Sequence, residues 1–238
     1  YLIVPISSLI TIFGIFIGST YAWTGVILFG LYTIIDTLTK DIHLKAEIDD
    51  DGNSYGIKIF QYLVMYVMLP VFITIQIILA WRIYQYTSGV VLQNLSLGSI
   101  EYQNGISGIN LIGAVISSAL WAGLGIIYGH ELSHNKKEGF FVSRLIMALS
   151  GASHFTYAHV YNHHLDLGHE DDPATAPRGR NVYLHTWLSH AGQSKFSFDM
   201  EAKKLKNQGK SFINKDNRWL LGYFYILPSI FLFIWSGG

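Results

Sequence analysis

The chain lacks cysteine and carries little charge. Without a thiol it can form no disulfide, and it can offer neither a thiolate metal ligand nor a cysteine-held iron–sulfur cluster. Only 13% of its 238 residues are charged, whereas soluble domains carry about a quarter. Acidic and basic side chains balance at 16 each, so no nucleic-acid partner is expected. These shortages exclude a disulfide scaffold and argue against an ordinary soluble domain.

Long apolar runs take the place of the missing charge. Half of the residues are hydrophobic, and the mean hydropathy is +0.32. A helix of about 20 residues crosses a bilayer, and five segments are apolar enough to do so. These predicted spans are Leu2–Thr20, Tyr21–Leu38, Ile59–Trp81, Gly108–Gly129 and a segment that begins at Trp219. The sequence therefore predicts an all-α, multi-span transmembrane bundle, with the first two spans paired in a hairpin around Tyr21.

The chain divides into three parts on this pattern. We expect transmembrane helices one to four in residues 1–129, a cytoplasmic histidine-rich cap in 130–218, and the start of a further span in 219–238. Because there is no initiator Met and the last residues stop inside an apolar run, we expect a fragment, the N-terminal two-thirds of a longer protein. Small residues within the spans should let helices approach closely or leave room for a linear chain; they are Gly14, Gly18, Gly25, Gly30, Gly113, Ala114, Ala119, Ala122, Gly123 and Gly125.

The positive charges orient the spans. Of the 16 Lys and Arg residues, 12 lie between Lys136 and Arg218, and Lys40, Lys45 and Lys58 lie between spans two and three. Cytoplasmic loops carry the excess of positive charge. Both segments are therefore predicted to be cytoplasmic, in an inner or plasma membrane, with Arg82 alone at the opposite exit of span three.

One apolar stretch should not cross the membrane. Phe140–Tyr157 is nearly long enough, but Arg144 and His154 interrupt it. If it crossed, the two histidine clusters on either side of it would lie on opposite faces. We therefore predict a helix at the membrane interface or packed under the bundle.

Histidines are concentrated at the end of the fourth span. His130 and His134 are spaced i, i+4, which places both rings on one face of a helix. His159 and His163 repeat this spacing. His164, the next residue, should point about 100° away from His163 around an α-helix. Five imidazoles exceed the three or four that a single zinc uses, and nitrogen ligands suit iron, copper, zinc or nickel. The pattern predicts a site for two metals.

The other histidines are weaker candidates. His43 lies alone in a polar loop, and His154 is better placed for packing or for supporting a ligand. His185 and His190 have no partner at helical spacing. His169, beside Glu170 and Asp171, is an alternative additional ligand.

Two other functions compete with a two-metal enzyme. His130 to His134 reads HELSH, which matches the HExxH motif of zinc metalloproteases, but that reading leaves the second cluster unexplained. A metal transporter would place its ligands near the bilayer centre, whereas these lie at the end of a span and in the polar segment after it.

These motifs resemble the integral-membrane alkane hydroxylases (AlkB-type alkane 1-monooxygenases), relatives of xylene monooxygenases and membrane fatty-acid desaturases. HELSH followed by Asn135 and Lys136 resembles the family's first histidine box, and HVYNHH followed by EDDPA resembles its second. The likeness continues through MEAKKLKNQG and NRWLLGY. The chain departs from the pattern at Ala158, Val160 and Asn162. For that reason, hydroxylation of aromatic methyl or fatty-acyl groups is the alternative within the same superfamily.

The resemblance implies a mechanism and its partners. It implies that His130, His134, His159, His163 and His164 bind two non-haem iron ions, with further ligands beyond Gly238. Glu131, Asp171 and Asp172 are candidates for orienting the ring N–H groups. The implied reaction hydroxylates an alkane, using O2 and electrons from an external donor such as rubredoxin with its reductase. The basic run Lys203–Lys210 could dock an acidic donor of this kind.

Overall fold

The computed structural model describes residues 2–39, 58–135 and 137–237. Lys40, His43, Lys45 and Lys136 lie outside the described residues. The chain forms two compact units, one made of Tyr1–Gly125 with Leu232–Gly238 and the other of Ile126–Phe231.

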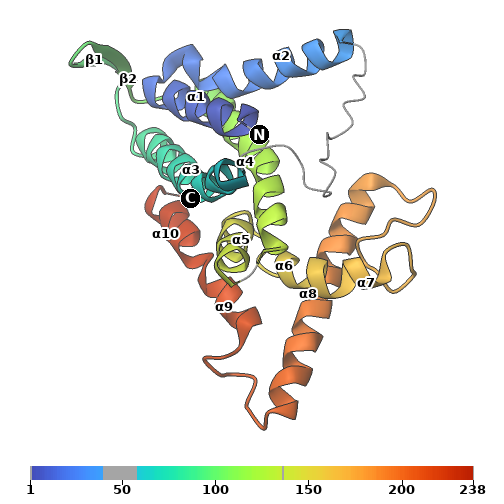
Figure 1. Cartoon of the computed structure of the whole chain (residues 1–238). Helices are drawn as coiled ribbons and strands as arrows, with labels where there is room; N and C mark the ends of the chain where they lie inside the picture. Colours follow the sequence, from blue (N-terminus) through green and yellow to red (C-terminus); the bar gives the residue numbers. More distant parts are fainter. Residues whose placement is uncertain (1, 40–57, 136, 238) are drawn as a thin grey trace. The chain divides into compact units, whose positions relative to one another are not determined.

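The first unit is a group of apolar helices with one small hairpin (Figure 1). Its helices are α1 (Ile3–Ile17), the 3-10 turn η1 (Ser19–Trp23), α2 (Thr24–Leu38), α3 (Lys58–Thr87) and most of α4 (Gly108–Ser133). The predicted hairpin around Tyr21 is present as η1, which joins α1 to α2. The end of α10 (Leu227–Trp235) completes the unit, where Trp235 stacks on Tyr84 of α3 at a centroid distance of 4.9 Å.

Small residues at some of the predicted positions allow the helices of this unit to approach closely, whereas a Cβ on Gly30 or Gly123 would meet nothing within 4 Å. A Cβ placed on Gly25 would lie 2.7 Å from the Ser117 Cβ and 2.9 Å from the Thr11 side chain. A Cβ on Gly113 would lie 2.5 Å from the Trp23 ring. Real side chains do not approach so closely, so glycine at these two positions lets α1, α2 and α4 pack backbone to side chain.

Four helices are long and apolar enough to cross a membrane within the described ranges: Ser19–Leu38, Ile59–Thr87, Gly108–Ser133 and Arg218–Trp235. They confirm the predicted spans two to five. The helix Ile59–Thr87 continues past the predicted end at Trp81, and Gly108–Ser133 continues past the predicted end at Gly129. Only 11% of the first and 6% of the last of these segments is buried by the protein. Apolar side chains therefore face outward, which suits a lipid surrounding.

The prediction of a first span over Leu2–Thr20 was wrong in length. The helix ends at Ile17, because Gly18 adopts a positive φ of 80° that breaks the α conformation. Fifteen residues of helix extend about 22 Å, short of the roughly 30 Å of bilayer hydrocarbon.

Arg82 does not cap the exit of the third span, as the sequence suggested, but is fully buried within α3. Its guanidinium donates to carbonyl oxygens on three elements. Nε donates to Ile15 O at 2.8 Å and Nη2 to Phe16 O at 2.7 Å. Nη1 donates to Gln85 Oε1, Gln103 O and Gly105 O at 2.6 to 3.0 Å. The charge thus satisfies the last carbonyls of α1, which have no partner inside the helix.

A β-hairpin not predicted from the sequence follows α3. Strands β1 (Gln93–Leu97) and β2 (Ile100–Asn104) pair antiparallel across the two-residue loop Gly98–Ser99. Tyr102 of β2 stacks on Phe16 of α1 at 5.5 Å, which fixes the hairpin at the end of that helix.

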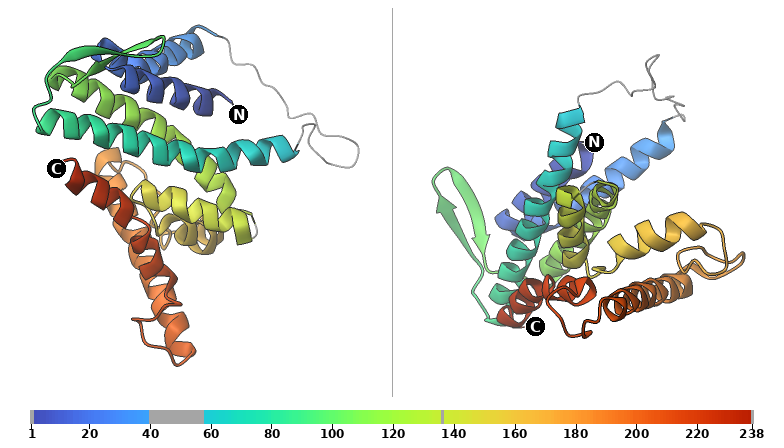
Figure 2. Two further views of the ribbon diagram at one scale, coloured as in Figure 1. Left: turned by 90° about the vertical axis from the view of Figure 1, so that its left-hand side faces the viewer. Right: turned by 60° about the horizontal axis from the view of Figure 1, so that its bottom comes forward.

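The second unit begins with the last turns of α4. It continues through α5 (Lys137–Leu149), α6 (Phe155–Ala158), the π-helical turn η2 (His159–His163), α7 (His164–Asp166), α8 (Val182–Asn207) and α9 (Arg218–Phe224). Helix α8 runs back alongside α6 (Figure 2). The Asn181 and Asn217 side chains accept backbone N–H groups and so cap the N-termini of α8 and α9.

The predicted single helix over Phe140–Tyr157 is two helices instead. Helix α5 ends at Leu149, and α6 starts only at Phe155. Gly151 has a φ of 80° and its N–H donates to Ala148 O, so the chain turns where the apolar pattern alone suggested continuity. The segment is not among the candidate spans of the described chain, in agreement with the prediction that it does not cross.

Candidate metal centre

The first pair of histidines lies where α4 ends. His130 is within the last turn of the helix, and His134 follows Ser133, with its N–H bonded to Glu131 O at 3.3 Å. The two rings are 5.2 Å apart between centroids. The predicted pairing on one face is therefore present. Glu131 is exposed, and its Oε1 lies 3.1 Å from His130 Nδ1.

The second cluster is not α-helical, contrary to the prediction. His159–His163 forms a π-helical turn, in which the N–H of His164 donates to His159 O, five residues back. This i→i+5 bonding brings residues five apart to the same face. His164 therefore points toward His159 rather than away from it. Turns of this kind occur preferentially at functional sites.

Four ring nitrogens converge as a result. His159 Nε2 lies 3.3 Å from His134 Nε2 and 2.9 Å from His164 Nε2. The ligand atoms of His130, His134 and His159 all lie within 4.8 Å of one another. Two nitrogens bound to one metal, each at about 2.1 Å and at right angles to each other, are about 3 Å apart. The donor set therefore fits a metal ion.

His163 is held by a buried carboxylate. Its Nδ1 donates to Asp172 Oδ2 at 2.8 Å, and Asp172 is only 2% exposed. Thr175 Oγ1 donates to the same oxygen, and the Ala174 N–H donates to Oδ1. With Nδ1 bound in this way, Nε2 of His163 is the nitrogen left to bind a metal, which is the usual arrangement of a carboxylate behind a metal-binding histidine.

Electrostatics keep these groups in the forms that a metal requires. Burial, together with the neighbouring histidines His130 and His164, lowers the pKa of His159 to about 3 and also lowers that of His134. Burial alone would raise the pKa of Asp172, but hydrogen bonds from Thr175, Ala174 and His163 lower it below its ordinary value. Neutral imidazoles with an ionised carboxylate behind them are ready to bind a cation.

The remaining candidates lie elsewhere in the unit. Asp171 and His169 are exposed and face each other at 3.4 Å, without a contact to the converging rings. His154 is buried against His190 at a centroid distance of 4.5 Å, and burial lowers its pKa to about 4. His185 lies 3.3 Å from Ala174 O.

Two contributors were not identified from the sequence. Phe155 stacks on His159 at 5.1 Å and 10° between planes, and Thr175 supports Asp172. The Asp-Pro pair at 172–173 is a turn signal that could have indicated the second. Nothing in the apolar pattern distinguishes Phe155 from a core residue.

The fold and this site define a helical membrane protein with a cluster of imidazoles that could hold a metal ion at one end of a candidate span. The profile of the fatty acid desaturase family matches residues 108–238, which include both histidine clusters. The match covers more than half of the chain, so the chain belongs to the fatty acid desaturase family.

Several relatives are alkane 1-monooxygenases. Alkane 1-monooxygenase 1 of Alcanivorax borkumensis is 28% identical over 221 residues, which are 88% of this chain and 49% of the relative. The enzyme of Pseudomonas putida is 31% identical over 48% of this chain and 29% of its own length. That of Acinetobacter baylyi is 32% identical over 45% of this chain and 27% of its own. The chain thus spans about half the length of the first relative and less of the others.

Proposed function

We propose that the chain is part of a membrane non-haem di-iron monooxygenase that hydroxylates the terminal carbon of alkanes. The observation that carries the proposal is the convergence of the ring nitrogens around His159, supported by His163 on Asp172. Membership in the fatty acid desaturase family and similarity to alkane 1-monooxygenases support the same reaction class.

Two metal ions fit the histidines better than one. Five imidazoles exceed the set of a single zinc site. The His163 ring lies 5.4 Å from that of His159 and is hydrogen-bonded to Asp172, but it is outside the group of three whose ligand atoms lie within 4.8 Å of one another. We assign His130, His134, His159, His163 and His164 as ligands. When bound, the irons would supply the activation of O2. The chain's own residues lower the pKa of His134 and His159, orient His163 through Asp172, and stack Phe155 on His159.

A largely apolar cavity, with Asp36 as the one charged residue in its lining, supports an apolar substrate. It lies in the first unit, has a volume of about 440 Å³, and is lined by α1, α2 and α4. Phe29, Tyr32 and Leu124 contribute to its walls. A linear alkane partitions into the bilayer and could enter such a cavity from the side. Replacing Leu124 with Trp should shorten the longest chain accepted and leave the iron content unchanged.

Electrons would come from a partner such as rubredoxin with its reductase. The basic run Lys203–Lys210, at the end of α8 and in the turn after it, is a candidate docking surface. Lys204 and Lys210 are paired with Glu201 and Asp216, whereas Lys203 and Lys206 are exposed and form no ion pair among the described residues. We place this surface and the metal centre on the cytoplasmic side, as the distribution of positive charge indicates.

The test is turnover by the full-length protein in a bilayer, supplied with O2, rubredoxin, its reductase and an alkane. We expect a primary alcohol, and no product from the His163→Ala variant. Glu131→Gln should reduce the rate but retain the metals. If only aromatic methyl or fatty-acyl substrates are hydroxylated, the protein would instead be assigned to another hydroxylase of the same superfamily. Peptide cleavage that Glu131→Gln abolishes would instead indicate the HExxH protease, because there the Glu is the general base.

A further inference from the structure

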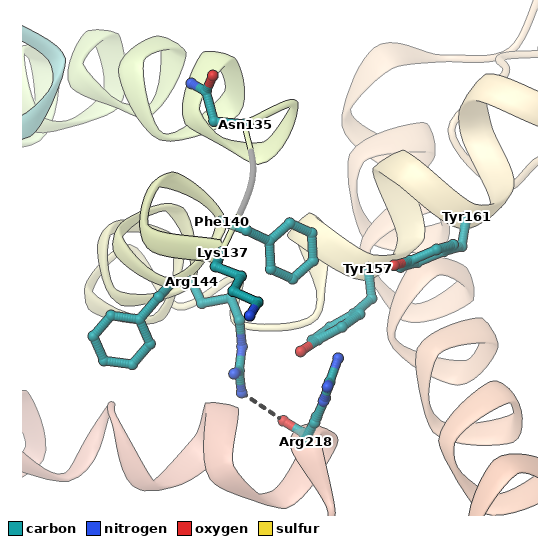
Figure 3. Close-up of a pocket in the computed structure, with 8 residues that line it drawn as sticks. Asn135, Lys137, Phe140, Arg144, Tyr157, Tyr161 and Arg218 are labelled. Atoms are coloured by element: carbon teal, nitrogen blue, oxygen red, sulfur yellow. Dashed lines mark hydrogen bonds between the residues drawn. The ribbon is translucent and has the colours of Figure 1, made fainter. Parts of the chain in front are cut away.

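A second cavity, in the second unit, has a different chemical character. It has a volume of about 430 Å³, and none of the five histidines lines it. Three of its eight lining residues are cationic, namely Lys137, Arg144 and Arg218, and none is acidic. Figure 3 shows Lys137 and Arg144 extending from α5 toward the same space that Tyr157 and Arg218 face from the other side. The cavity therefore concentrates positive charge.

Arg144 is built into the wall of this cavity. It is only 7% exposed, and its guanidinium carbon lies 5.3 Å from the ring centres of both Tyr157 and Tyr225. Nη2 donates to Arg218 O at 3.0 Å (Figure 3). Its Nε is buried and has no hydrogen-bond partner among the described residues. A buried, unpartnered N–H on a cation is costly, so this donor indicates a missing acceptor.

The described residues provide no carboxylate partner for these three cations. None of the three cations forms an ion pair within the part of the chain that the structure describes. The nearby carboxylate of Glu201 is already engaged by Lys204 Nζ at 2.7 Å and by the backbone N–H of Arg218 at 2.9 Å. Two guanidinium groups and an ammonium group around one cavity are the arrangement that recognises phosphate oxygens.

We propose that this cavity binds a phosphate group, presented by a lipid headgroup or by a soluble phosphate. Arg218 is the first residue of the candidate span Arg218–Trp235, which places the cavity at the level where headgroups lie. Phe140 and Phe141 supply an apolar wall beside the cations, and this wall suits the glycerol and upper acyl carbons of a lipid. The phosphate would complete the hydrogen bonding of Arg144.

The test measures binding to the full-length, iron-loaded protein in a neutral detergent. The probes are inorganic phosphate and dihexanoyl phosphatidylglycerol, each followed by titration calorimetry. The variants are Lys137→Gln and Arg218→Gln, because both side chains are exposed and their loss should not affect folding. Lys215→Gln, an exposed lysine outside the cavity, makes the same change of charge and serves as the control.

We expect each cavity variant to weaken binding about tenfold, the effect of losing one charge-assisted contact, and the control to stay within about twofold of the wild type. Binding of both probes would show that the phosphate itself is recognised, and binding of the lipid alone would identify the headgroup as its source. The proposal is overturned if neither probe binds the wild type, or if both cavity variants bind as the control does. Iron content should be the same in all four proteins, so failure here leaves the proposed oxygenase untouched.

Discussion

The surroundings of Arg82 and those of His159 both contain buried nitrogen-rich side chains, and they differ in what the nitrogens face. Around Arg82 every guanidinium nitrogen donates to an oxygen, at distances from 2.6 to 3.0 Å. Around His159 the ring nitrogens face one another, at 3.3 and 2.9 Å. The guanidinium nitrogens of Arg82 all have hydrogen-bond acceptors within the protein. The ring nitrogens around His159 instead direct several lone pairs toward one point.

That difference separates a structural role from a functional one. A buried cation saturated by backbone carbonyls stabilises the helices that supply them, because each carbonyl would otherwise remain unpaired. Imidazoles that converge on one another gain little until a cation binds between them. Substitutions in the two places should therefore affect different properties, stability at Arg82 and metal content at the histidines.

The largest effect is expected for His159→Ala in the full-length protein. His159 is the ring that both His134 and His164 approach, so its loss should remove most of the bound iron and all turnover. His169→Ala is the matched control, because His169 is exposed and contacts only Asp171 among the charged groups described. Metal analysis that finds equal iron in both variants would contradict the assignment.

Arg82→Met should destabilise the protein by about 4 kcal/mol, because it leaves several buried carbonyl oxygens without a donor. Folded variant protein should still bind iron at the wild-type ratio. Ile77→Met changes an exposed position on the same helix and should shift the free energy of unfolding by less than about 0.5 kcal/mol. Denaturant titration in detergent measures both. If Arg82→Met lost iron without losing stability, Arg82 would have a role in metal binding and not the structural role assigned here.

Asp172→Asn should weaken iron binding about 10- to 100-fold, the usual effect of removing a carboxylate that orients a metal-binding histidine. The neighbouring Asp171→Asn is an exact charge match at an exposed site that does not contact His163. It should leave affinity unchanged. Competition with a chelator measures the iron affinity of both variants. Equal weakening would show that iron affinity depends on the net charge and not on the hydrogen bond between Asp172 and His163.

Gly18→Ala should cost about 1 to 2 kcal/mol, since φ is 80° and a Cβ there would lie 2.4 Å from Arg82 Nη2. Gly123→Ala, where a Cβ would meet nothing within 4 Å, should be neutral or slightly stabilising because alanine favours helix. Thermal unfolding in detergent separates the two. A neutral Gly18→Ala would indicate that the contact with Arg82 yields easily.

Much of the fold could be predicted because apolar length is a direct physical requirement of a bilayer. The spans beginning near Ser19, Ile59, Gly108 and Arg218 follow from long apolar runs with few charges. The end of α1 at Ile17 and the break after Leu149 could not be predicted in this way. Both depend on a single glycine with a positive φ inside a run whose composition still favours helix.

The site was predictable in composition but not in geometry. The i, i+4 spacing predicted His130 and His134 as a pair. Asp172 was one of three candidate supporting carboxylates, and the sequence did not distinguish it from Glu131 and Asp171. The position of His164 could not be derived, because α-helical periodicity places it away from His159 and only the π-helical turn brings it back. The surroundings of Arg82 depend on contacts between residues 15 and 105, which no local pattern reveals.

The most direct test of the central claim is the metal content of the full-length protein, measured by elemental analysis together with the protein concentration. The account predicts about two irons per chain, retained when Asp171 or His169 is replaced. One zinc per chain without iron would contradict it, because a single zinc needs no more than four of the ligands assigned here.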